Sequence, residues 1–172
     1  MKHSVITEND ISAWKDKTGE LYHFPSRYKK FLEEGTKLIY YKGRIKDKKF
    51  NDFRLSPDPH YFGIASIKRI FPDKESYKND YYAEISGFIP FSKPVLAKNG
   101  NEYLEKIPES RKGNYWRDAV RPITEEIYNL VISKSDLSSI NESNLNDLNQ
   151  GLNLSFESEI SEGKKKLRFT SF

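Results

Sequence analysis

The sequence predicts a small α+β domain in which a bent, mainly antiparallel β-sheet closes toward a barrel and short helices flank it. Runs of β-branched and aromatic residues alternate with turn signals between residues 20 and 90. A helical period is confined to short segments. At 172 residues, with 11 Tyr, 11 Phe and 2 Trp, the chain is long enough to form one domain with a largely aromatic core.

The first strand is expected at residues 20 to 24, an aromatic-rich run that stops at Pro25. Residues 25 to 34 follow as a helix of two to three turns, because proline is favoured at the opening of a helix. One face of that helix would carry the apolar side chains of Tyr28, Phe31 and Leu32.

Three further strands are expected on the same grounds. The β-prone run 37 to 41 gives the second strand, and the basic, proline-rich stretch 44 to 59 gives a long loop. Residues 60 to 70 form a central third strand, in which Gly63 suggests a bulge or a close backbone approach. The run 80 to 88 returns as the fourth strand.

The second half of the chain is less regular. Proline and glycine residues predict loops with a helical turn from 90 to 113. The clearest helix is expected at 124 to 132, where Thr124 can cap the N-terminus and Ile127, Leu130 and Val131 share a face. The stretch 133 to 158 is rich in Ser and Asn, which is typical of a linker.

Charge and composition narrow the classes of function. The net charge is +4 and the isoelectric point is about 9.0, which mildly favours an acidic partner. The absence of cysteine excludes disulfides, thiol catalysis and thiolate zinc sites. Neither a signal peptide nor a membrane-spanning run is recognisable, so we expect a cytoplasmic protein with no membrane partner.

The sequence offers little material for catalysis. It has three histidines, at positions 3, 23 and 60, with no metal-ligand spacing, no phosphate-binding loop and no nucleophile elbow. The nuclease pattern that places a lysine two residues after a strand carboxylate fails at Glu84, which is followed by Ile85 and Ser86. We therefore expect no catalytic residue, no metal and no cofactor in this chain.

Aromatic and basic residues interleave over the first third of the chain. Between residues 37 and 54 lie seven cations and two acids. Cations neutralise phosphates, and aromatic faces stack on unpaired bases, so this combination suits nucleic acid. The alternative is that the aromatic residues form the core while the lysines solvate a loop.

Four segments, taken in order, resemble the EVE-type branch of the PUA-like superfamily, which is related to the YTH readers of methylated RNA. They are Tyr22-x-Phe24-Pro25-x-x-Tyr28, Gly35 to Tyr41, Tyr61 to Ile67, and Phe71-Pro72-Asp73. The resemblance implies a small, strongly bent β-barrel that holds a flipped, modified base in an aromatic cage.

Two later segments resemble modification-dependent restriction proteins. Residues 116 to 126 are similar to the segment that follows the reader domain in those proteins, and residues 162 to 169 are similar to the run that precedes their HNH nuclease. The resemblance implies a reader domain at 1 to 132, a connector and basic tail at 133 to 172, and a nuclease domain or subunit as partner.

The implied ligand is duplex DNA with a modified base. The base pocket would be formed by Tyr22, Phe24, Ser26, Tyr40 and Tyr41. Adjacent strand residues face opposite ways, so one of the last two belongs to the core. Asp58 and His60 would either bind the base or cap the loop, and Trp116 is assigned to core or hinge packing.

The basic loop supplies the expected phosphate contacts, which are Lys42, Arg44, Lys46, Lys48 and Lys49. Whether the base is methylcytosine, hydroxymethylcytosine or methyladenine is left open by the sequence. Two rival functions also fit the same pattern. One is an RNA-binding PUA-like module that takes bases from single strands, and the other is a protein-interaction domain.

Overall fold

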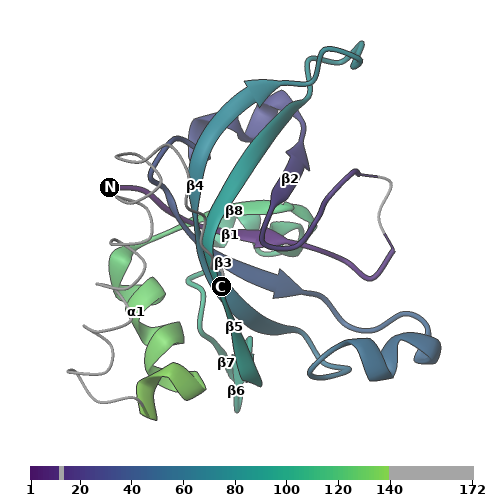
Figure 1. Ribbon diagram of the computed structural model, residues 1–172. Helices are drawn as coiled ribbons and strands as arrows, with labels where there is room; N and C mark the ends of the chain where they lie inside the picture. The colour runs from purple at the N-terminus through teal and green to yellow at the C-terminus, as the bar shows by residue number, and fades with distance from the viewer. Residues whose placement is uncertain (12–13, 140–172) are drawn as a thin grey trace, which may run out of the picture.

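A computed structural model describes residues 1–11 and 14–139. Six strands form one mixed sheet in the order β2-β5-β4-β3-β1-β8, curled into a half-barrel (Figure 1). The strands are β1 (His3–Thr7), β2 (Leu21–Phe24), β3 (Lys37–Lys42), β4 (His60–Pro72), β5 (Tyr81–Leu96) and β8 (Val120–Ile123). A small ribbon of β6 (Lys98–Asn99) and β7 (Glu102–Tyr103) stands apart from this sheet. The predicted α+β, barrel-like fold is thus confirmed.

Two strands of the six-stranded sheet were not predicted from the sequence. β1 pairs in parallel with β3 and antiparallel with β8, which makes the sheet mixed. β8 contains Pro122, which has no backbone N–H to donate to a second neighbouring strand. Because β8 lies at the edge of the sheet, it pairs with one strand alone and tolerates the proline. Both strands are too short to show a period of their own, and their pairing partners lie far away in the sequence.

The helix that follows β2 is shorter than expected. Residues 25–34 contain the six-residue 3-10 helix η1 (Ser26–Phe31) in place of a two- to three-turn helix. The remaining 3-10 turns are η2 (Lys48–Phe53), η3 (Glu109–Arg111), η4 (Tyr115–Arg117) and η5 (Asp136–Ser139). Within the described ranges, no helix has the length and apolar character needed to cross a membrane.

Helix α1 (Glu125–Lys134) confirms the clearest helix prediction, and the backbone N–H of Ile127 donates to the hydroxyl of Thr124. Its buried side chains are Tyr128 and Val131, whereas Leu130 is 39% exposed, so the expected apolar face was right for Val131 and wrong for Leu130. The packed region also continues beyond the predicted boundary at residue 132, since Leu137 belongs to the same apolar cluster as Val131. The predicted basic tail lies outside the described residues.

The long hairpin of β4 and β5 corrects the prediction of loops from residue 90 (Figure 1). β5 continues through two prolines to Leu96, because bulges in the ladder accommodate residues without an N–H. One register shift lies between Tyr61 and Gly63, where the ring of Phe88 approaches the glycine. The bulge and close approach expected at Gly63 are both present.

The sheet separates two apolar clusters. Leu38 and Tyr40 of β3 face the barrel interior, and Ile39 and Tyr41 face a second cluster that includes residues of α1 and β5. This alternation follows from the period of two along a strand. The structure therefore settles which of the two adjacent tyrosines belongs to the barrel core, namely Tyr40.

Tyrosine hydroxyls close the open side of the half-barrel. The hydroxyl of Tyr22, on edge strand β2, donates toward the carbonyl oxygens of Thr7 and Ala119 at 3.2 and 3.4 Å. The hydroxyl of Tyr28 accepts from the backbone N–H of Ala119 at 3.0 Å. These contacts connect the β2 edge of the sheet to the β1 and β8 edge.

Candidate nucleic-acid interface

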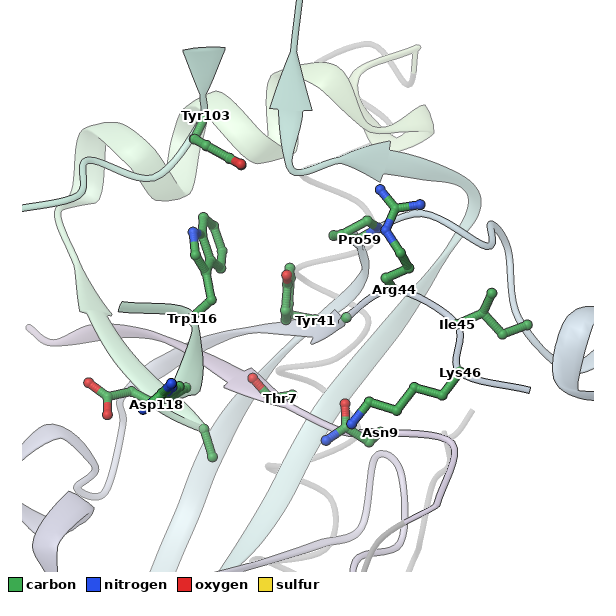
Figure 2. A pocket seen from close by; sticks show the side chains of 13 residues that line it. Thr7, Asn9, Tyr41, Arg44, Ile45, Lys46, Pro59, Tyr103, Trp116 and Asp118 are labelled. Carbon is green, nitrogen blue, oxygen red and sulfur yellow. The ribbon is translucent and has the colours of Figure 1, made fainter. Parts of the chain in front are cut away.

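A cleft of about 630 Å³ opens on the outer side of the sheet, where β1 and β3 end beside the segment that leads into β8 (Figure 2). Its lining combines aromatic rings with cations and small polar groups. The aromatic residues are Tyr41, Tyr103 and Trp116, the cations are Arg44, Lys46 and Arg117, and the polar residues include Thr7, Asn9 and Asp118. We call this hollow the aromatic cleft.

The aromatic rings form a continuous apolar surface. The rings of Tyr41 and Trp116 stack with centroids 5.6 Å apart, and those of Trp116 and Tyr103 lie 5.1 Å apart at a tilt of 47°. Tyr41 is nearly buried, whereas Tyr103 is 45% exposed. Because Tyr41 and Trp116 already contact each other, a flat ligand would stack on their outward surface and not between them.

The cations differ in how far they are engaged. The side chain of Arg44 is 70% exposed and contacts the carboxylate of Asp58 at 2.9 Å. Lys46 and Arg117 are exposed, and neither forms an ion pair with another described residue. The acidic Asp118 is held by Arg111 at 2.5 Å. The cleft therefore presents positive charge to a ligand.

A buried ion pair lies behind the aromatic rings. The guanidinium of Arg121 donates twice to the carboxylate of Glu105, and its centre lies 4.4 Å from the ring centroid of Tyr41 and 4.8 Å from that of Trp116. Burial lowers the pKa of Arg121, but the hydrogen bonds and charge of Glu105 outweigh this effect, so the arginine stays protonated. Burial also raises the pKa of Tyr41 to about 12, which keeps its hydroxyl neutral.

The four aromatic residues that were candidates for the base pocket do not come together around the aromatic cleft. Tyr22, Phe24 and Tyr40 are buried in the barrel interior, on the opposite side of the sheet from the aromatic cleft. Of the four, only Tyr41 lines the cleft. The physical reason is the alternation of side chains along β2 and β3, which directs Tyr22, Phe24 and Tyr40 inward.

The polar residues of the predicted base pocket are also dispersed. Ser26 is exposed at the start of η1. His60 is fully buried and donates from Nδ1 to the carbonyl oxygen of Asp58 at 2.7 Å, and burial lowers the pKa of its imidazole. The carboxylate of Asp58 is engaged with Arg44. Asp58 and His60 thus make the loop-capping contacts that were one of their two expected roles.

The predicted phosphate contacts divide into three groups. Arg44 and Lys46 line the aromatic cleft, and Lys48 and Lys49 lie exposed on η2. The side chain of Lys42 is only 14% exposed, because its ammonium donates to the carbonyl of Glu8 and contacts Asp10. Lys42 is therefore engaged within the protein in this conformation, and its phosphate contact stays a prediction.

Among the aromatic and basic residues of the cleft, three were missed or assigned to another role. Tyr103 and Arg117 were not singled out in the sequence, and Trp116 was assigned to packing. They lie in or next to a segment whose prolines and glycines leave no helical or strand periodicity to recognise. They are also far from Tyr41 in the sequence, and only the fold brings them close to it. The adjacent pair Trp116-Arg117 was the available signal, because an aromatic ring beside a cation is common where nucleic acid binds.

A second cleft, of about 430 Å³, has a different character. Glu8, Lys42, Arg54 and His60 contribute its polar lining. The two cations there are engaged with Asp10, Lys42 at 3.4 Å and Arg54 at 2.6 Å. Within residues 1–11 and 14–139, no group of three or more His, Cys, Asp or Glu side chains is placed to hold a metal ion. The aromatic cleft is therefore the stronger candidate for an anionic ligand.

Comparison with known proteins gives a likeness of fold. No family model matches the sequence, and no curated protein matches it. Among solved structures, the chain is similar to the NMR structure of Rpa0253 from Rhodopseudomonas palustris, with a TM-score of 0.50 and 18% sequence identity. The similarity covers 80% of this chain and 94% of that chain. At this identity the likeness shows the barrel-like fold alone.

Proposed function

We propose that this chain is a nucleic-acid-binding reader domain that stacks one base in the aromatic cleft and holds the backbone with the surrounding cations. The observation that carries the proposal is the meeting of three aromatic rings and three cations at one hollow. A base stacked on an aromatic side chain gains about 1 to 3 kcal/mol, and phosphates gain from nearby cations.

The polar lining gives the cleft a means to distinguish bases. Thr7, Asn9 and Asp118 border the aromatic rings (Figure 2). Their side chains supply hydroxyl, amide and carboxylate groups, which together can donate to or accept from the edge of a base. Arg111 holds the Asp118 carboxylate in place. A base in the cleft would thus be bound by its face and read by its edge.

We further propose that the fold is of the PUA-like, EVE type and that the ligand is a modified base flipped out of duplex DNA. The curled sheet and the sequence resemblance support this proposal together. Flipping costs a few kcal/mol of stacking and pairing, which stacking in a protein pocket can offset. The chain would act as the specificity part of a modification-dependent restriction system, with an HNH nuclease as its partner and no catalysis of its own.

The test is a titration of the protein with four duplexes that carry methylcytosine, hydroxymethylcytosine, methyladenine or no modification. We expect one modified duplex to bind most tightly. Trp116→Ala should weaken that complex about five- to a hundredfold and remove the preference for the modified duplex over the unmodified one. Tyr77→Ala is the matched control, because Tyr77 is fully exposed on the β4 to β5 turn, away from the cleft.

Lys46→Ala separates backbone contacts from base contacts. It should weaken all four duplexes alike and flatten the dependence of affinity on salt. Equal affinity of the wild-type protein for the four duplexes would refute modified-base reading. Tighter binding to single-stranded RNA would favour the RNA-binding alternative, and binding of a protein partner that is insensitive to salt would favour the interaction-domain alternative.

A further inference from the structure

The aromatic cleft adjoins two smaller hollows. One, of about 300 Å³, shares Arg44, Pro59 and Tyr103 with the cleft. The other, of about 60 Å³, shares Asn9, Arg44 and Lys46 with it. Arg44 borders all three, so the three hollows adjoin one another at the ends of β1 and β3, and we call them together the groove.

The 300 Å³ hollow has the chemistry of a second base site. Tyr103 is shared with the aromatic cleft and is 45% exposed, and the ammonium of Lys98 lies 5.5 Å from the centroid of its ring. Leu96 and Ala97 add apolar surface. A flat ring could lie against this surface while Lys98 faces an attached phosphate.

The 60 Å³ hollow is too small for a base and suits a backbone group. Lys46 borders it, with Phe50 and the exposed Ile11 on its sides. Asp10 is the acidic residue in its lining, and Arg54 binds that carboxylate at 2.6 Å. The positive charge of Lys46 is therefore available to a phosphate.

The acidic groups of the groove are paired throughout. Asp10 binds Arg54, Asp58 binds Arg44, and Asp118 binds Arg111. Lys46 and Lys98 form no ion pair with the residues in 1–11 and 14–139. The groove therefore offers unpaired positive charge at both ends, as an extended polyanion requires.

We propose that this groove holds a single strand of nucleic acid over two adjacent nucleotides. One base lies in the aromatic cleft, the next lies beside Tyr103 and Lys98, and the phosphate between them faces Arg44. Two neighbouring bases in separate hollows are both unpaired, so the bound segment is single-stranded or locally opened duplex. This inference rests on the proposed function of the aromatic cleft and adds the form and length of its ligand.

A length series tests the inference. The probes are 5-methyldeoxycytidine 5′-phosphate, the two dinucleotides that add one thymidine on its 5′ or 3′ side, and a single-stranded tetranucleotide. One dinucleotide should bind about five- to a hundredfold more tightly than the mononucleotide, as expected for one more stacked base. Lys98→Ala should weaken the dinucleotide and leave the mononucleotide unchanged. Lys106→Ala, which alters an exposed lysine outside these hollows, is the control.

The outcomes separate the two proposals. If the mononucleotide and dinucleotides bind equally and Trp116→Ala weakens both, the single-strand groove is wrong and the base-binding cleft stands. If Trp116→Ala changes neither complex, the base-binding cleft is wrong, and the groove fails with it. An equal loss of mononucleotide and dinucleotide affinity in Lys98→Ala would also overturn the second base site.

Discussion

Glu105 and Arg121 form a two-bond ion pair directly behind the aromatic cleft, with both N–O distances at 2.8 Å. The hydroxyls of Tyr61 and Tyr115 donate to the same carboxylate at 2.7 and 2.8 Å. The guanidinium in turn contacts the ring of Trp116. The pair therefore connects the second apolar cluster to the aromatic surface that we propose as the base site.

Glu105→Gln should destabilise the fold, because it leaves the guanidinium of Arg121 buried without its counter-charge. Breaking one partner of a buried ion pair costs about 3 to 5 kcal/mol. Urea unfolding followed by circular dichroism measures the change in the free energy of unfolding. Glu102→Gln, at an exposed position of β7, is the control and should change it by less than about 0.5 kcal/mol. A loss below about 1 kcal/mol for Glu105→Gln would contradict the structural role of the pair.

Gly63→Ala should destabilise the β4 to β5 hairpin. A methyl group there would lie 2.7 Å from a ring carbon of Phe88 and 3.0 Å from the carbonyl oxygen of Ile89. The backbone atom has little freedom to move, so we expect a loss of about 1 to 3 kcal/mol by thermal or urea unfolding. Gly113→Ala meets nothing within 4 Å and should be nearly neutral. Equal stability of the two variants would show that the bulge relaxes.

Local patterns in the sequence predicted the parts of this fold that depend on local chemistry. The turn signals located β2, β3 and β4, and the capping threonine located α1. The strand β1 escaped detection because its stability comes from pairing with β3 and β8, which begin far away in the sequence. β5 was expected to end at Phe88, because the prolines and glycines from Pro90 onward predict loops, and the bulged ladder overrides that preference.

The candidate site was harder to predict than the fold. Period-two alternation showed that Tyr40 and Tyr41 face opposite sides, but not which side carries a cleft. That answer depends on Trp116, which η4 places against Tyr41. The family resemblance implied a cage built from the aromatic residues of β2 and β3, whereas most of those rings fill the barrel interior. Burial decides between these roles, and burial is a property of the assembled sheet.

Tyr28→Phe should weaken the closure of the half-barrel. The change removes the hydroxyl that accepts from the backbone N–H of Ala119 and leaves that partly buried donor without its partner. Loss of such a bond costs about 1 to 3 kcal/mol. Hydrogen exchange at the amide of Ala119 should accelerate, and unfolding by urea should move to a lower concentration. Tyr77→Phe, at a fully exposed position, should change neither measurement.

Asp16→Asn should change how stability depends on pH. Burial raises the pKa of Asp16 from 3.8 to about 6, despite the hydrogen bond that its carboxylate accepts from the N–H of His23 at 2.7 Å. Between about pH 4 and pH 6 the folded protein thus keeps a proton that the unfolded chain has lost, so this group makes the free energy of unfolding fall as pH rises through that window. Asparagine keeps the accepting oxygen and carries no charge. The free energy of unfolding of the variant, relative to that of the wild-type protein, should therefore be higher at pH 7 than at pH 4. Urea unfolding of both proteins at both pH values measures this difference. A difference between the two proteins that is the same at both pH values would show that Asp16 ionises as freely in the fold as in the unfolded chain.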